Sequence, residues 1–224
     1  MRFIAQWLIH KLLVAVALLF VLFLLTIFAL RWVNPPVTTF MILQSDADQR
    51  YYSWTPIDYI DESVMLAVIA SEDQRFAEHA GIDFISIEKA LSEAPRDGGV
   101  RGASTITQQL TKNLFLWPGR NMVRKGVEAV LSIFVDAILS KRRILELYLN
   151  VVEFGPGVYG VGAASQIYFR VLPARLNNSE AALLAAVLPN PKTLRISAPS
   201  PYVRERQKWI LRQMRQMRPM PQQL

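Results

Sequence analysis

The chain has 224 residues, of which 52% are hydrophobic and 19% are charged, so its composition excludes a mainly disordered or fibrous protein and predicts one domain with appendages. It contains no cysteine, which excludes a disulfide framework, a thiol nucleophile and cysteine-ligated metal sites. The 25 Lys and Arg against 18 Asp and Glu give a net charge of +7, which suits anionic partners such as nucleic acid, phospholipid head groups or phosphorylated substrates.

The first predicted element is an apolar helix at residues 12–30, whose only polar member is Thr26. A helix of this length spans about 28 Å, close to the hydrocarbon thickness of a bilayer. Arg2 and Lys11 precede it, which favours a cytoplasmic amino terminus with the rest of the chain outside. The alternatives are a buried core helix and a cleaved signal peptide, although the sequence before Arg31 is a poor cleavage site.

The rest of the chain has the spacing of apolar residues that is typical of helices. Asp61 and Ser63 are candidate caps for a helix that runs toward Ser71. No series of alternating runs indicates a large sheet. We therefore predict a mainly α domain with further helices at residues 84–92, 105–115, 122–139, 142–149, 179–188 and 203–217. The predicted organisation is a cytoplasmic tail at 1–11, a transmembrane anchor at 12–30, a juxtamembrane connector at 31–60 and the domain at 61–224.

Two adjacent carboxylates, Glu72 and Asp73, follow the first helix of this domain. A partly desolvated carboxylate at such a helix end suits general-base chemistry near neutral pH. The alternative is a solvated helix end with His79 on the surface. The segment does not match His-Glu-x-x-His and therefore predicts no zinc site.

A second segment places polar side chains where a core helix would have leucines. Ser104 or Thr105 is a candidate cap, but capping does not account for the polar residues that follow. These side chains share a helical face and could bind several hydroxyls or an oxyanion, as a sugar or phosphate ligand presents. They are Gln108, Gln109, Lys112 and Asn113.

A third segment has Arg124 and Lys125 one helical turn before Glu128. The alternative interpretation is an ordinary surface ion pair, worth less than about 1 kcal/mol. The two cations lie in the first turn of the predicted helix, where the macrodipole disfavours positive charge. An anionic ligand therefore explains them better than stability does.

A glycine pattern further on suggests a different ligand. Gly155, Gly157 and Gly160 match G-x-G-x-x-G, and the acidic Glu180 follows, as in dinucleotide-binding folds. A predicted helix precedes this pattern and no second strand of a βαβ unit follows it. We therefore predict no dinucleotide site.

Four segments occur in a characteristic order, and together they resemble the peptidoglycan glycosyltransferases, the first catalytic module of class A penicillin-binding proteins. The resemblance runs from about Asp61 to about Met217, and the chain resembles the monofunctional, membrane-anchored type. Ala80 and Ala103 depart from the common pattern but touch no proposed catalytic group. The segments are Glu72-Asp73-x-x-Phe76-x-x-His79-x-Gly81, Gly102-x-Ser104-Thr105-Ile106-Thr107-Gln108-Gln109, Arg124-Lys125-x-x-Glu128 and Lys141-x-x-Ile144-Leu145-Glu146-x-Tyr148-Leu149-Asn150.

The resemblance implies a lysozyme-like helical domain behind a single amino-terminal transmembrane helix. It implies polymerisation of lipid II into β-1,4-linked glycan strands, with inversion and release of undecaprenyl pyrophosphate. In this reaction Glu72 would take the proton from the acceptor hydroxyl, and Glu128 would be the second essential carboxylate. The leaving group needs charge stabilisation more than a proton, which Lys112, Arg120, Arg124 and Lys125 would supply. The other implied substrate-binding residues are Asp73, Lys89, Ser104, Gln108 and Gln109.

The implied partners are lipid II, the growing glycan strand, the bilayer, and proteins of cell-wall synthesis or division. Nucleic acid is not expected, because the basic part of the chain would face outward. We expect the cytoplasmic (inner) membrane as the location, with a periplasmic catalytic domain. The resemblance implies a reaction that requires no cofactor, and the sequence leaves open whether a divalent cation, Mg²⁺ or Mn²⁺, assists it.

Two other functions remain open. A membrane-bound lytic enzyme would share the helical fold and a catalytic Glu, but it has no pyrophosphate to stabilise. A non-enzymatic scaffold could bind anionic lipid or glycan through the basic carboxyl end, although these charges are better explained as the solvated face of an amphipathic helix. The residues concerned are Arg204, Arg206, Lys208, Arg212, Arg215 and Arg218.

Overall fold

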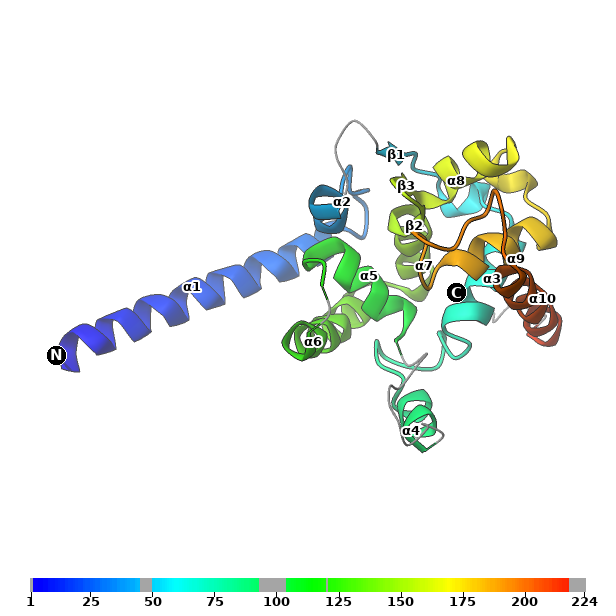
Figure 1. The fold of residues 1–224 in the computed structure, drawn as a ribbon. Coiled ribbons are helices and arrows are strands. Elements are labelled where there is room, and N and C mark those ends of the chain that lie inside the picture. Colours follow the sequence, from blue (N-terminus) through cyan, green and yellow to red (C-terminus); the bar gives the residue numbers. More distant parts are fainter. Residues whose placement is uncertain (1, 45–49, 93–103, 120, 218–224) are drawn as a thin grey trace. The chain divides into compact units, whose positions relative to one another are not determined.

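The computed structural model describes residues 2–44, 50–92, 104–119 and 121–217 (Figure 1). The chain divides into two compact units, residues 1–35 and 36–224. The first unit contains helix α1 (Arg2–Ala29), in which Gln6–Ala29 is long and apolar enough to cross a membrane. This finding fits a single-pass membrane anchor and extends the predicted apolar helix toward the amino terminus.

The second unit is mainly α, as predicted. Its helices are α2 (Thr39–Gln44), α3 (Glu62–Glu72), α4 (Phe84–Ser92), α5 (Ile106–Phe115), α6 (Met122–Ile138), α7 (Lys141–Val151), α8 (Gly160–Phe169), α9 (Asn178–Val187) and α10 (Pro201–Gln216). Two 3₁₀ turns, η2 (Ile57–Tyr59) and η3 (Pro173–Arg175), complete the helical elements described. Residues 36–60, which we expected to form part of a connector, are grouped with this unit and contribute α2 and η2.

A small sheet accompanies the helices. Its strands β1 (Tyr51–Tyr52), β2 (Glu153–Gly155) and β3 (Val158–Tyr159) lie in the order β1-β3-β2, with β1 parallel and β2 antiparallel to β3. The glycine pattern thus forms a β-hairpin that leads into α8. Gly160 has φ +79°, and a Cβ there would lie 2.5 Å from the carbonyl oxygen of Asn150, so a close backbone approach explains this glycine.

Helix α3 lies in the core of the second unit. The seven residues 64–70 are all buried except Met65, and α3 packs against both α9 and α10 (Figure 1). Helix α5 packs against α6 and α7 in the same unit. Asp61 caps α3 by accepting a hydrogen bond from the Ser63 amide, and Thr105, rather than Ser104, caps α5. The carboxyl end of α3 and helix α5 carry polar side chains of the candidate site.

Candidate active site

Glu72 is the last residue of α3, and its side chain is 10% exposed. One carboxylate oxygen, Oε2, accepts a hydrogen bond of 3.0 Å from Gln109 Nε2 on α5. The other, Oε1, accepts one of 3.2 Å from Arg206 Nη2 on α10. Burial raises the pKa of Glu72, and the contacts with Gln109 and Arg206 partly oppose this rise. A third, longer hydrogen bond of 3.5 Å comes from Ser71 Oγ to Oε1. The site therefore contains a desolvated acid whose ionised form is held by three donors.

Gln109 has a second partner at its other end. The hydroxyl of Tyr148, from α7, donates a hydrogen bond of 2.9 Å to Gln109 Oε1. Tyr148 is fully buried, and burial raises the pKa of its hydroxyl well above 10. Three helices, α3, α5 and α7, thus meet through one hydrogen-bonded series that ends at Glu72.

Asp73 faces the amino terminus of α5. Its carboxylate accepts a hydrogen bond of 3.0 Å from the Ile106 amide and lies 3.0 Å from His79 Nε2. The side chains of Asp73 and His79 are 2% and 6% exposed. The expected alternative, a solvated helix end with a surface His79, is therefore wrong. These contacts tie the end of α3 to the start of α5.

The cations of α6 form the second part of the site. Arg124 Nη1 lies 2.6 Å from Glu128 Oε2, and Lys125 Nζ lies 2.5 Å from Glu128 Oε1. Lys125 also donates to Ser104 Oγ at 2.8 Å and to Gln108 Oε1 at 3.4 Å. The Glu128 and Arg124 side chains are only 3% and 9% exposed, whereas that of Lys125 is 37% exposed. An ordinary surface ion pair does not describe this cluster.

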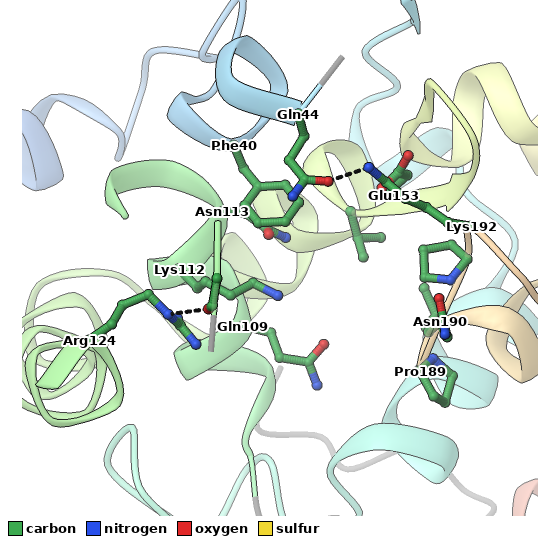
Figure 2. A pocket seen from close by; sticks show the side chains of 14 residues that line it. Phe40, Gln44, Gln109, Lys112, Asn113, Arg124, Glu153, Pro189, Asn190 and Lys192 are labelled. Carbon is green, nitrogen blue, oxygen red and sulfur yellow. Dashed lines mark hydrogen bonds between the residues drawn. The ribbon is translucent and has the colours of Figure 1, made fainter. Parts of the chain in front are cut away.

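A cavity of about 310 Å³ joins residues of both parts of the site. Figure 2 shows Gln109, Lys112 and Arg124 on one side of it and Glu153, Asn190 and Lys192 on the other. The ammonium group of Lys112 lies 5.0 Å from the ring centre of Phe40. The lining residues are Phe40, Gln44, Gln109, Lys112, Asn113, Gly119, Arg124, Val152, Glu153, Leu188, Pro189, Asn190, Pro191 and Lys192.

Most of the predicted site residues thus lie around Glu72, around Glu128 or along the cavity. Lys89 differs, because it is an exposed residue in the last turn of α4. Its described hydrogen bond is through its backbone carbonyl, which accepts from Ser92 Oγ. Arg120 lies outside the described residues. Among the described residues, no group of three or more His, Asp or Glu side chains could hold a metal ion.

Sequence reasoning missed three residues of the site. Arg206 was grouped with the solvated face of the last helix, yet its side chain is 22% exposed and reaches Glu72. Glu153 is buried and lines the cavity, and burial raises its pKa against the opposing influence of Gly157, Lys192 and Lys112. Tyr148 was part of a motif without a chemical role. Only the spacing of Arg206 from Ile210, a buried position one turn away, gave a signal for its inward position.

Comparison with known proteins gives a consistent result. Residues 39–215 match the Transglycosylase family. A biosynthetic peptidoglycan transglycosylase of Shewanella frigidimarina is 54% identical over 187 residues, which cover 84% of this chain and 82% of the relative. One from Pasteurella multocida is 47% identical over 206 residues, covering 88% and 84%. One from Escherichia coli is 58% identical over 165 residues, covering 73% and 68%.

Proposed function

Since the chain belongs to the Transglycosylase family, we propose that it is a peptidoglycan glycosyltransferase that polymerises lipid II into glycan strands. One observation carries the proposal. The buried acid Glu72 and the cation cluster of Arg124 and Lys125 are connected through α5, whose Gln109 contacts Glu72 and whose Gln108 contacts Lys125. A general base on α3 and an anion-binding group on α6, both held against the same intervening helix, suit transfer of a sugar from a pyrophosphate.

In the proposed reaction Glu72 is the general base. It takes the proton of the 4-hydroxyl of the acceptor GlcNAc, and the hydroxyl oxygen attacks C1 of the donor MurNAc. The bond from C1 to the pyrophosphate oxygen breaks on the opposite face, which inverts the configuration and gives a β-1,4 link. Its electron pair leaves with undecaprenyl pyrophosphate. The raised pKa of Glu72 supports this role, because a base titrating nearer to neutral pH accepts a proton more readily.

The cations are proposed to stabilise the departing pyrophosphate. Lys125 is the partly exposed member of its cluster, so it can contact a ligand while Glu128 fixes its position. Arg124 and Lys112 line the cavity and would extend the same positive field toward the pyrophosphate, together with Arg120. Preorganised charges of this kind favour a transition state that develops negative charge.

Other predicted residues support these groups. Ser104, Gln108 and Gln109 are proposed to shape the sugar and phosphate sites, as expected from the resemblance. For Asp73, the contacts with Ile106 and His79 support a positioning role at the amino terminus of α5. Lys89 is proposed to contact substrate only peripherally, because it lies on the exposed face of α4.

The membrane topology is also a proposal. We propose that α1 crosses the cytoplasmic membrane once, with the amino terminus in the cytoplasm and the catalytic domain outside, where lipid II is polymerised. The basic residues at the amino end of the span support this orientation. A reporter fused after Leu224 should be active only outside the cytoplasmic membrane. Activity of a cytoplasmic reporter at that position would contradict both the topology and the substrate.

A direct assay tests the function. The purified full chain, incubated with labelled lipid II, is expected to form a polymer that lysozyme degrades, and Glu72→Gln should form almost none. Assays with EDTA and with added Mg²⁺ or Mn²⁺ test whether a divalent cation assists. Cleavage of preformed glycan without polymer formation would instead favour the lytic enzyme. Proteins of cell-wall synthesis or division remain proposed partners.

A further inference from the structure

Gln109 connects a fully buried tyrosine to the proposed general base. Its Oε1 accepts the Tyr148 hydroxyl at 2.9 Å, and its Nε2 donates to Glu72 Oε2 at 3.0 Å. A primary amide has one donor end and one acceptor end. Whichever end faces Glu72 therefore decides whether the carboxylate receives a hydrogen bond or meets the lone pairs of an oxygen.

The tyrosine removes this ambiguity. Burial and the nearby charges of Glu72 and Asp73 raise the pKa of Tyr148 well above 10, so its hydroxyl keeps its proton. An ionised Glu72 can only accept hydrogen bonds, which leaves Gln109 Oε1 as the acceptor for the Tyr148 proton. All three groups are satisfied only when the amide nitrogen faces Glu72.

We propose that Tyr148 is a positioning residue that acts through Gln109, holding the amide N–H against Glu72 so that this carboxylate stays ionised and ready to accept the substrate proton. The proposal rests on the proposed function of Glu72 as general base. It adds a residue that touches neither substrate nor the reacting atoms, and that lies on α7, outside the helix pair that carries the base and the cations.

The other groups that face Glu72 do not replace this contact. Arg206, from α10, donates to the opposite oxygen, Oε1, at 3.2 Å, and Ser71 Oγ lies 3.5 Å from the same atom. Asp73 directs its carboxylate to Ile106 and His79. Among the described contacts, Oε2 is held by Gln109, so a change at Gln109 acts on that oxygen directly.

Loss of the Tyr148 hydroxyl frees the amide to turn. In Tyr148→Phe the ring still fills its buried position, but Gln109 Oε1 no longer has the tyrosine as a donor. The amide can then turn its oxygen toward Glu72 and accept a hydrogen bond from the O–H of the neutral carboxyl. This exchange favours the protonated acid and disfavours the ionised base.

The experiment compares pH profiles of lipid II polymerisation for the full chain. Tyr148→Phe is expected to shift the acid limb of the kcat profile to higher pH by about one unit, which lowers kcat about tenfold on the acid side and allows recovery at higher pH. KM for lipid II should stay the same. Tyr159→Phe is the matched control, because it removes the hydroxyl of another fully buried tyrosine and should leave the limb in place.

A double-variant cycle tests whether the effect passes through Gln109. Gln109→Ala removes the amide N–H that contacts Glu72 and keeps Tyr148 itself. This variant alone should shift the acid limb of the kcat profile to higher pH. In that background Tyr148→Phe should shift the limb no further. A full additional shift would overturn the proposed route. Should Tyr148→Phe fail to fold, an unshifted limb in Gln109→Ala would overturn the proposal by itself.

A second readout separates this proposal from the proposed function. The Glu72 carboxyl can be titrated by NMR in the full chain carrying ¹³C-labelled glutamate, with the signal assigned by its loss in Glu72→Gln. A higher pKa of Glu72 in folded Tyr148→Phe supports the positioning role of Tyr148. This holds even if the wild-type protein fails to polymerise lipid II, because that failure would reject only the proposed function. An unchanged titration of Glu72 in folded Tyr148→Phe overturns the positioning role of Tyr148, whatever the activity.

Discussion

Two buried carboxylates of the site, Glu72 and Glu128, have opposite surroundings. Glu128 is 3% exposed and forms ion pairs of 2.6 and 2.5 Å with Arg124 and Lys125. Glu72 is 10% exposed and has one cation, Arg206, at 3.2 Å and a neutral amide, Gln109, at 3.0 Å. Burial is the largest influence on the pKa of Glu72 and raises it, whereas Glu128 is held by two short ion pairs.

This difference assigns different chemistry to two residues of the same type. A carboxylate that is desolvated and only partly compensated, such as Glu72, has a raised pKa and accepts a proton more readily. A carboxylate that pairs with two cations instead fixes their positions, and its removal would leave both cations without their counter-charge. Pairs of acids whose environments differ in this way divide the roles of base and electrostatic support. The two roles can be separated by mutation.

The largest expected effect is at the base. Glu72→Gln keeps the side-chain shape but cannot accept the proton, so we expect the rate of polymerisation to fall by about 10² to 10⁴. Lipid II polymerisation in a continuous fluorescence assay measures this loss, and the melting temperature shows whether the fold is intact. Near-wild-type polymerisation by a folded Glu72→Gln would assign the base elsewhere and remove the contrast with Glu128.

The next effect is at the cation cluster. Lys125→Ala is expected to lower polymerisation by about 10² to 10³, because a positioned charge on a departing diphosphate contributes several kcal/mol at the transition state. The family resemblance also implies inhibition by moenomycin, a phosphoglycolipid that resembles the growing glycan chain, and Lys125→Ala should bind it more weakly than the wild type. The matched control is Lys208→Ala, since Lys208 pairs with Glu205 in an exposed ion pair of the same sequence spacing. Unaltered polymerisation and moenomycin affinity in Lys125→Ala would reject the proposed stabilisation of the pyrophosphate by Lys125.

Stability should distinguish the members of this cluster. Lys125 is 37% exposed, so its loss should cost less than about 1 kcal/mol of unfolding free energy. Glu128→Gln leaves the buried Arg124 without its counter-charge and should cost about 3 to 5 kcal/mol. Denaturant unfolding measures both values. The sequence alone predicts small stability changes for both variants, as for a surface ion pair. The burial of Glu128 changes this prediction for Glu128→Gln. Equal, small losses of unfolding free energy in both variants would instead support the surface ion pair.

The sequence predicted the long amphipathic helices well, because periodic apolar residues and caps such as Asp61 are local signals. It did not predict α8, whose first turn, Gly-Val-Gly-Ala, lacks both a polar face and a side-chain cap. The sheet was also missed, since strands of two or three residues show no alternation and β1 pairs with β3 across about a hundred residues of chain. Such pairing depends on tertiary contacts.

The residues of the site likewise divide into those that local sequence signals predict and those that only tertiary contacts bring together. Glu72, Glu128 and the residues of α5 follow from motifs whose members lie close in sequence. Arg206 reaches Glu72 across 134 residues of chain, and Tyr148 reaches Gln109 across 39. A helix of alternating basic and apolar residues does not reveal which cation points inward. Only the packing of α10 against α3 brings Arg206 to the base.

A smaller effect is expected at Arg206, which lowers the pKa of Glu72. Arg206→Gln removes this charge, so the acid limb of the polymerisation profile should move to higher pH, with about a tenfold loss on the acid side if the shift is about one unit. Arg212→Gln, at an exposed position of the same helix, is the control. An unmoved limb in Arg206→Gln would show that Glu72 depends on its amide partner alone and would sharpen its contrast with Glu128.

The smallest expected effect concerns stability, and it has the opposite sign from the effect on activity. The folded-state pKa of Glu72 is raised above its ordinary value, so between the two pKa values the folded chain binds more protons than the unfolded chain. The contribution of Glu72 to the free energy of unfolding is therefore greatest at pH values below its unfolded pKa, and it decreases as pH rises through the folded pKa. Glu72→Gln carries no such charge and should unfold at a higher denaturant concentration than wild type at neutral pH. The difference should shrink as the pH is lowered toward 4. If the two proteins differ by the same amount at both pH values, the burial of Glu72 imposes no ionisation penalty, and its proposed contrast with the ion-paired Glu128 fails.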